Sequence, residues 1–186
     1  VLMTPKSLLR HKLCVSPLEE LVEGKFYSVI DDAEIESAES VRRIVLCSGK
    51  VYYDLLEARH KAGHVGGDIA MVRVEEIYPF PSAELRELLA RYERAEQIVW
   101  LQEEAKNMGA WSFVQYHIER LLPERCELRY IGRDEAASPA TGSHQVHLSE
   151  QRDIIDQALD MQAREVILSA AQRAVAADGK RTSGQV

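Results

Sequence analysis

The chain has 186 residues, 46% of them hydrophobic, and a formal net charge of −7 at pH 7. An acidic protein repels phosphate, which argues against a general nucleic-acid-binding protein, and no apolar stretch has the ~20 residues that a membrane helix needs. One domain with appendages is the expected organisation. The chain opens with Val1 and no signal peptide, so we expect an excised piece of a longer protein.

Residues 1–40 are mixed in character. Val1–Pro5 is interpreted as the end of a strand whose partners lie outside the chain, and a short helix is expected around Pro17–Leu21. Phe26–Ile30 fits an edge strand. The acidic run Asp31–Glu39 follows, and its charge predicts a solvated loop.

From residue 41 apolar strands alternate with amphipathic helices. The expected strands are Ile44–Cys47, Ile69–Val74, Gln97–Leu101 and Glu127–Ile131. The expected helices are Val51–Ala62, Ser82–Tyr92, Ala110–Leu122 and Leu148–Leu159. Short connections and right-handed crossovers predict a three-layer α/β fold with a doubly wound, mostly parallel sheet. The first three strands should be parallel neighbours.

The rest of the chain is polar or weakly patterned. Gly132–His147 is predicted to be an ordered surface loop, Met161–Ala177 has a helix-forming composition, and Gly179–Val186 has the composition of a frayed tail. We therefore divide the chain into a linker with edge elements (1–40), an α/β domain (41–159) and a helical or flexible tail (160–186).

The turn Ser48-Gly49-Lys50 lies between a buried strand and a helix. Such a turn points backbone N–H groups and a positive helix end at the carboxyl edge of the sheet, where anions bind in open α/β folds. A single glycine, and Val51 in place of a magnesium-binding hydroxyl, argue against a nucleotide-hydrolysing phosphate loop. A simple anion site and a plain structural turn are the two remaining interpretations.

Lys106 and Arg133 follow two other strands at their carboxyl ends, so a parallel sheet should bring them to the same edge as Lys50. Three converging cations repel one another unless an anion or an acidic side chain lies between them. Glu103 or Glu104 could fill that position, and so could a nucleotide phosphate. The candidate anion site comprises Ser48, Gly49, Lys50, Lys106 and Arg133.

The segment Gln102–Trp111 is unusually rich in polar groups. Glu103 and Glu104 are adjacent on an extended chain, so they should point to opposite sides and cannot share a proton. The segment is either part of a cleft or a packed connector. In a connector, Trp111 would fill the core and Gly109 would permit a close backbone approach.

No catalytic set and no metal site are predicted. Three unpaired cysteines, Cys14, Cys47 and Cys126, are expected to be reduced, buried thiols of a cytosolic protein. His60 and His64 are four residues apart, as helical metal ligands are, but the glycine between them should end the helix. They are interpreted as surface histidines.

Four long motifs resemble one family. They are Met3-Thr-Pro-Lys-Ser-Leu-Leu-Arg10, Leu46-Cys-Ser-Gly-Lys-Val-Tyr-Tyr-Asp-Leu55, Gln102-Glu-Glu-Ala-Lys-Asn-Met-Gly-Ala-Trp111, and Tyr130-Ile-Gly-Arg133 with Ala137-Ser-Pro-Ala-Thr-Gly142. Ile69–Pro81 matches as well. Their order and spacing resemble the carboxyl-terminal region of the thiamine-diphosphate-dependent, decarboxylating component of 2-oxoglutarate dehydrogenase, over about residues 1–159.

The resemblance implies an intact oxidoreductase of the tricarboxylic acid cycle. Such an enzyme decarboxylates 2-oxoglutarate on thiamine diphosphate and magnesium, and succinylates lipoyl groups of the partner dihydrolipoyl succinyltransferase. The Gly-Asp-Gly cofactor motif, the activating glutamate and the substrate-binding histidines would belong to upstream domains. This chain would then be non-catalytic, bind no thiamine diphosphate, and follow a pyrimidine-binding domain.

A domain similar to the carboxyl-terminal domain of transketolases is expected to make homodimer and scaffold contacts. In some members this region also helps to bind acetyl-CoA or AMP, which would suit the turn Ser48–Lys50. The bacterial cytoplasm is the expected location, ahead of the mitochondrial matrix. An independent CoA- or nucleotide-sensing module is the alternative. A small stand-alone enzyme would need a nucleophile–base pair that the sequence does not offer.

Overall fold

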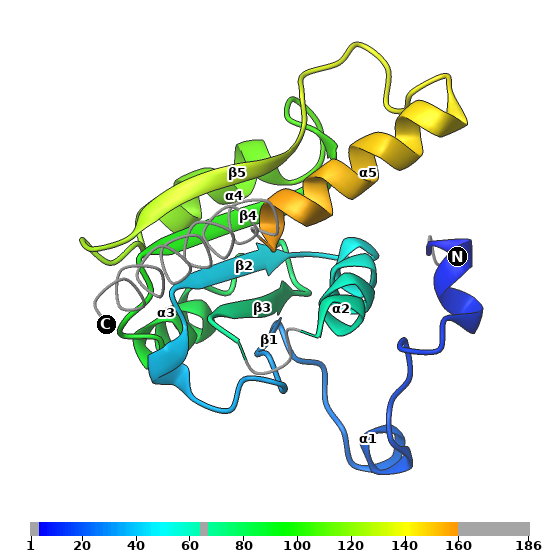
Figure 1. Ribbon diagram of the computed structural model, residues 1–186. Coiled ribbons are helices and arrows are strands. Elements are labelled where there is room, and N and C mark those ends of the chain that lie inside the picture. The colour runs from blue at the N-terminus through cyan, green and yellow to red at the C-terminus, as the bar shows by residue number, and fades with distance from the viewer. Residues whose placement is uncertain (1–3, 64–66, 160–186) are drawn as a thin grey trace, which may run out of the picture.

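The computed structural model describes residues 4–63 and 67–159, which fold around one five-stranded sheet (Figure 1). The strand order is β1-β3-β2-β4-β5. The strands are β1 (Val29–Ile30), β2 (Arg43–Cys47), β3 (Ile69–Val74), β4 (Gln97–Ala105) and β5 (Glu127–Arg133). Only the short edge strand β1 runs antiparallel to its neighbour, β3. The predicted mostly parallel α/β sheet is therefore confirmed.

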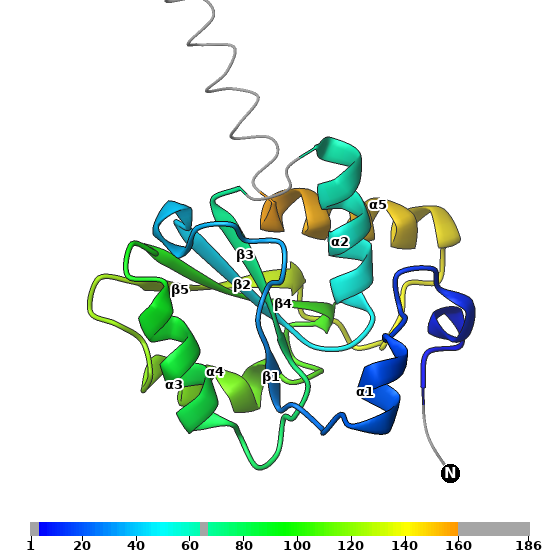
Figure 2. The same cartoon turned by 90° about the horizontal axis from the view of Figure 1, so that it is seen from below.

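Helices cover both faces of the sheet and give the predicted three layers (Figures 1 and 2). One pair, α2 (Val51–Ala62) and α5 (His144–Ala158), packs on one face. The other pair, α3 (Ser82–Arg91) and α4 (Trp111–Glu119), packs on the opposite face. Shorter elements precede the first parallel strand: the 3-10 helices η1 (Lys6–Arg10) and η2 (Ala38–Ser40), and α1 (Leu18–Val22).

Strand β2 lies at the centre of the parallel part of the sheet. It pairs in parallel with β3 on one side and with β4 on the other, which confirms that the first three predicted strands are neighbours. From β2 the chain continues to β3 on one side, then crosses to β4 on the other side of β2, and ends the sheet at β5. The carboxyl ends of β2 and β4 consequently flank a topological switch point, where open α/β sheets form their crevice.

Alternation along the strands divides the core between the two faces. Leu46 and Trp100 point to α3 and α4, whereas Val45 and Val99 point to α2 and α5. Trp100 is 1% exposed, and its indole N–H donates to Gln102 Oε1 at 3.0 Å. Both faces of the central strands are buried, which explains their continuous apolar sequence.

Several element boundaries differ from the prediction. Strand β4 extends four residues further, because the chain pairs with β5 again at Ala105 and Arg133 after a register shift. Helix α5 begins at His144 rather than Leu148, since Ser143 caps it by accepting a hydrogen bond from the Val146 N–H. Of the expected edge strand Phe26–Ile30, only Val29 and Ile30 pair. The expected segments Met161–Ala177 and Gly179–Val186, and the first three residues, lie outside the described residues.

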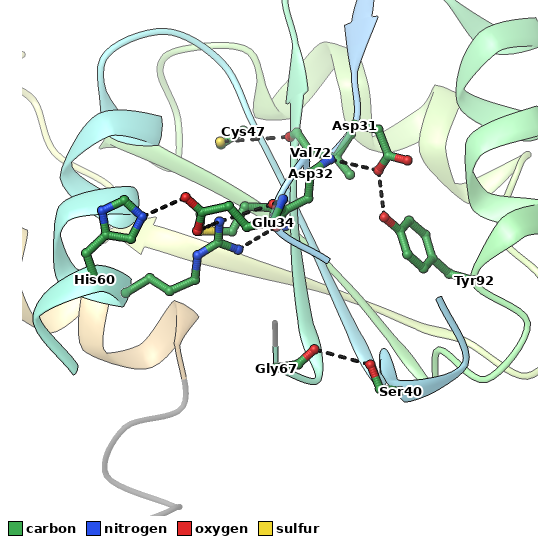
Figure 3. A network of polar contacts seen from close by, with 11 residues as sticks. Asp31, Asp32, Glu34, Ser40, Cys47, His60, Gly67, Val72 and Tyr92 are labelled. Atoms are coloured by element: carbon green, nitrogen blue, oxygen red, sulfur yellow. Dashed lines mark hydrogen bonds and ion pairs between the residues drawn. The ribbon is translucent and has the colours of Figure 1, made fainter. Parts of the chain in front are cut away.

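The prediction of a solvated loop for the acidic run Asp31–Glu39 is wrong for its first part, whose carboxylates are held by partners in the body of the domain (Figure 3). Glu36 and Glu39 are exposed, as predicted. Arg59 on α2 is 2% exposed and donates to Asp32 Oδ2 at 2.5 Å and to Glu34 Oε2 at 2.6 Å. Asp32 also accepts a hydrogen bond from the Met71 N–H at 2.8 Å. One buried carboxylate thus joins this loop to a helix and to a central strand.

Neighbouring residues extend this network on both sides. Glu34 contacts His60 Nε2 at 2.7 Å, and Asp31 accepts hydrogen bonds from the Tyr92 hydroxyl and from Arg91. Burial lowers the pKa of a guanidinium, but the hydrogen bonds and charges of Asp32 and Glu34 outweigh burial and raise the pKa of Arg59. The Arg59 guanidinium therefore keeps its charge despite its burial.

Replacing Arg59 by Met should lower the free energy of unfolding by about 3–5 kcal/mol, because Asp32 would remain buried without a countercharge. The double variant Arg59→Met/Asp32→Asn should be more stable than Arg59→Met alone, since the neutral amide no longer needs that charge. Urea unfolding at pH 7 measures both. Equal stability of the two variants would contradict a buried-charge origin. His60→Ala, at a more exposed end of the network, is the control and should cost less than about 1 kcal/mol.

Trp100→Ala should lower the free energy of unfolding by about 3–5 kcal/mol, because it removes a large, fully buried side chain between the sheet and two helices. Chemical denaturation monitored by circular dichroism provides the measurement. Tyr116→Ala is the control, since Tyr116 is 59% exposed, and it should change stability by about 0.5 kcal/mol or less. A similar loss in both variants would contradict the described core.

Candidate functional site

Lys50 lies where the turn after β2 enters α2, and two carboxylates neutralise it. Its ammonium is 2.6 Å from Asp54 Oδ2, one helical turn away, and 3.2 Å from Glu103 Oε2 on β4. Burial opposes the charged form, but the hydrogen bonds and charges of Asp54 and Glu103 raise the pKa of Lys50. The contact with Glu103 spans the switch point between β2 and β4.

Arg133 ends β5 and approaches the same glutamate from the other side. One guanidinium nitrogen donates to the backbone carbonyl of Glu103, and Nε donates to Glu150 Oε2 at 2.8 Å. The remaining nitrogen lies 3.1 Å from Gln151 Oε1 and 3.1 Å from His147 Nδ1, both on α5. Gln151 in turn donates to Asp54 at 3.0 Å, so the network closes on Lys50.

Lys106 does not extend this network. Its backbone N–H donates to the Arg133 carbonyl at 3.0 Å, but its ammonium lies 5.7 Å from the centre of the Tyr130 ring. Tyr130 packs with Trp111 on the α3–α4 side of the sheet, opposite the side that carries α2 and α5. The structure therefore brings together two of the three predicted cations, with Glu103 between them.

The turn lies between β2 and α2, as predicted. Gly49 has a φ of 74°, a left-handed conformation that glycine adopts without strain, and a Cβ there would meet open space. Ser48 is half-buried beside it. The turn is thus accessible from the carboxyl edge of the sheet, while the ammonium of Lys50 is occupied by carboxylates.

The segment Gln102–Trp111 is a packed connector. Gln102 is buried; its Oε1 accepts from the Trp111 N–H, and its amide donates to the Met108 carbonyl at 2.8 Å. Gly109 has a φ of 66°, and a Cβ there would lie 3.0 Å from the Gln102 side chain. The expected roles of Gly109 and Trp111 are confirmed. Glu103 and Glu104 lie on opposite sides, because Glu103 contacts Lys50 of the turn before α2, whereas the Cβ of Glu104 lies against Gly109 on the side of Trp111.

Sequence reasoning missed most partners of the two cations. The contact of Asp54 with Lys50 could have been predicted from the sequence, because the two residues are four apart at the start of a helix. The contacts of Glu150 and Gln151 with Arg133 could not, since they depend on the path of the loop that brings α5 to the end of β5. Gln102 had only its polarity in an apolar strand, and a buried polar side chain implies a full set of partners.

A cavity of about 710 Å³ opens beside Arg133, between the loop after β5 and α5. Its walls include Asp134, Glu135, Glu150 and Asp153. Four carboxylates against one arginine give the cavity a negative potential, which disfavours a phosphate. An anion that binds at this edge would therefore lie on the Lys50 side of the network.

The described residues offer little reactive chemistry. Within 4–63 and 67–159, no three His, Cys, Asp or Glu side chains are grouped as metal ligands. Burial, aided by the charge of Glu75, raises the pKa of the Cys47 thiol to about 12, so it stays protonated and is a poor nucleophile. None of the described helices is both long and apolar enough to cross a membrane.

Comparisons with known proteins identify relatives over most of the chain. The family model described as 2-oxoglutarate dehydrogenase C-terminal matches residues 15–159. The 2-oxoglutarate dehydrogenase E1 component of Exiguobacterium sp. is 45% identical over 172 residues, which cover 92% of this chain and 18% of that protein. The E1 component of Azotobacter vinelandii is 45% identical over 161 residues, which cover 85% of this chain and 17% of that protein.

A solved structure titled split gene transketolase, inactive beta4 tetramer, is also similar, with a TM-score of 0.47 and 19% identity. The similarity covers 66% of this chain and 39% of that one. In the curated relatives, by contrast, the chain spans less than a fifth of the total length.

Proposed function

The chain belongs to the 2-oxoglutarate dehydrogenase C-terminal family, and we propose that it forms the carboxyl-terminal domain of an enzyme that decarboxylates 2-oxoglutarate on thiamine diphosphate. The observation that carries this proposal is the family match over residues 15–159, joined to 45% identity with much longer E1 components. Residues 1–40, which include the edge strand β1, would link it to a pyrimidine-binding domain, and residues 41–159 would form the α/β domain. The expected tail, 160–186, lies outside the described residues.

In this proposal the domain does no chemistry itself. The paired cations at the sheet edge and the protonated Cys47 thiol support a structural role, because neither offers a free acid, base or nucleophile. Thiamine diphosphate and magnesium would bind to the remainder of the polypeptide. The partners would be a second enzyme subunit and a dihydrolipoyl succinyltransferase. The proposed location is the bacterial cytoplasm, in keeping with the bacterial relatives.

The mass of the native polypeptide tests this assignment. It should be several times the 21.0 kDa of this chain, and the purified native protein should decarboxylate 2-oxoglutarate. A native product of 21.0 kDa without this activity would overturn the proposal and favour an independent CoA- or nucleotide-sensing module.

The 186-residue chain alone should not bind thiamine diphosphate, because the cofactor-binding groups are proposed to lie elsewhere in the polypeptide. Calorimetric titration with the cofactor and magnesium should show no heat of binding. The native full-length enzyme, titrated in the same buffer, is the positive control. Micromolar binding by the short chain would assign it to a different domain of the enzyme.

We propose in addition that the turn Ser48-Gly49-Lys50, with Arg133, takes the phosphate of a regulatory nucleotide such as AMP or acetyl-CoA. The support is its place at the switch point of the sheet and a helix start beside an open left-handed turn. A phosphate there would replace the Glu103 carboxylate on Lys50. Lys106, whose ammonium lies over Tyr130, is left out of this site.

Lys50→Ala should then weaken nucleotide binding by about tenfold or more, the effect of losing one charge-assisted hydrogen bond. Glu103→Gln should strengthen it, because the competing negative charge is gone. Titration of a fluorescent AMP analogue into the full-length enzyme measures both, with Lys106→Ala as the control that should bind like the wild type. Unchanged affinity in Lys50→Ala and Glu103→Gln would leave the turn with a purely structural role.

A further inference from the structure

A band of large apolar side chains lies exposed on the segment before the sheet. We call it the N-terminal apolar surface; its members, each between 69% and 76% exposed, are Leu9, Val15, Leu18, Leu21, Val22 and Phe26. Together with Tyr27 they make up seven of the eleven exposed large hydrophobic residues in the described part of the chain. Apolar exposure concentrated in this way marks an interaction surface.

Three of these side chains share one face of a short helix. Leu18, Leu21 and Val22 are spaced i, i+3 and i+4 on α1, so they share one helix face. Every residue from 15 to 27 is exposed, and both views place α1 outside the three layers of the domain (Figures 1 and 2). A single five-residue helix is not stable in water by itself, so its apolar face needs a partner.

The segment is nevertheless anchored at both of its ends. His11 contacts Glu57 of α2 at 3.3 Å, and Leu13 packs against the core cluster under α2 and α5. At the other end Val29 pairs with Val74 of β3. A groove of about 570 Å³ runs between the segment and this edge strand, with Phe26 and Tyr27 in its wall. The surface is thus held in a fixed place beside the sheet edge.

Two facts indicate what covers this surface. The family match begins at residue 15, so the exposed residues from Val15 to Phe26 lie within the region shared by the family. The curated relatives have more than four-fifths of their length outside the match. A second copy of the chain is a poorer partner, because a twofold contact at α1 would bring Glu19, Glu20 and Glu23 of both copies together.

We propose that the N-terminal apolar surface packs against the remainder of the longer polypeptide, which the family's C-terminal position places ahead of these residues. This inference rests on the proposed function, since it requires an enzyme much longer than this chain. The contact fixes the orientation of the α/β domain, because the segment that carries it is joined to α2 and to β3.

Hydrogen–deuterium exchange on the 186-residue chain and on the native full-length enzyme tests the contact. Amides of residues 18–27 should exchange at least tenfold more slowly in the enzyme. Leu21→Asp should lower the melting temperature of the enzyme by several degrees and leave that of the short chain unchanged, because Leu21 is already exposed there. Leu148→Asp, 51% exposed on α5, is the matched control and should change neither.

Equally fast exchange in both proteins would overturn this inference while leaving the proposed function intact. A short chain that sediments as a dimer, and becomes monomeric with Leu21→Asp, would assign the surface to a second copy instead. A native protein of 21.0 kDa would remove the proposed function itself, and the mass measurement detects that outcome separately.

Discussion

The buried pair between Arg59 and Asp32 decides how the edge of this domain is built. A carboxylate with a 1% exposed side chain is costly unless it is paired and hydrogen-bonded, and here it has both a bidentate guanidinium and the Met71 N–H. This carboxylate fixes the path of the chain. The chain before β2 must pass beside α2 and β3 to satisfy this carboxylate, and the edge strand β1 and the segment that precedes it are placed by that requirement.

The carboxyl edge of the parallel sheet shows a second form of the same constraint. Two cations, Lys50 and Arg133, end up on either side of Glu103, and Asp54 and Glu150 complete the neutralisation. The crevice at the switch point is therefore filled by the protein's own carboxylate. An anionic ligand that binds to Lys50 must displace the Glu103 carboxylate, so its affinity is the difference between two interactions of Lys50 with a negative group.

Sequence reasoning recovered the parts of the fold that local pattern determines. The strands around Ile44, Ile69 and Ile98, and the helices between them, follow from apolar runs and glycine or proline boundaries, and handedness then leaves few orders for the sheet. Strand order also placed Glu103 or Glu104 among the cations at the carboxyl edge, and the contact of Glu103 with Lys50 agrees with that expectation. Sequence reasoning could not recover the pairing of Asp32 with Arg59, because the two residues are far apart in the chain and no strand order relates them. The acidic run was misread for this reason: composition describes a charge but not its partner.

The charged groups at the carboxyl edge of the sheet have partners within the domain, whereas the apolar side chains of the N-terminal apolar surface are exposed. At the sheet edge every cation of the Lys50–Arg133 network has a carboxylate within 3.2 Å, so that region is electrostatically complete without a further partner. The side chains of the N-terminal apolar surface remain exposed to solvent, although the Arg59–Asp32 pair and the pairing of β1 with β3 hold the adjoining chain in place. Burial of an exposed apolar surface stabilises a contact without placing any reactive group in it. An anchored surface of this kind is therefore suited to fix the orientation of a domain and not to take part in a reaction. In the proposed enzyme, the domain would contribute through the way it is joined to the rest of the polypeptide.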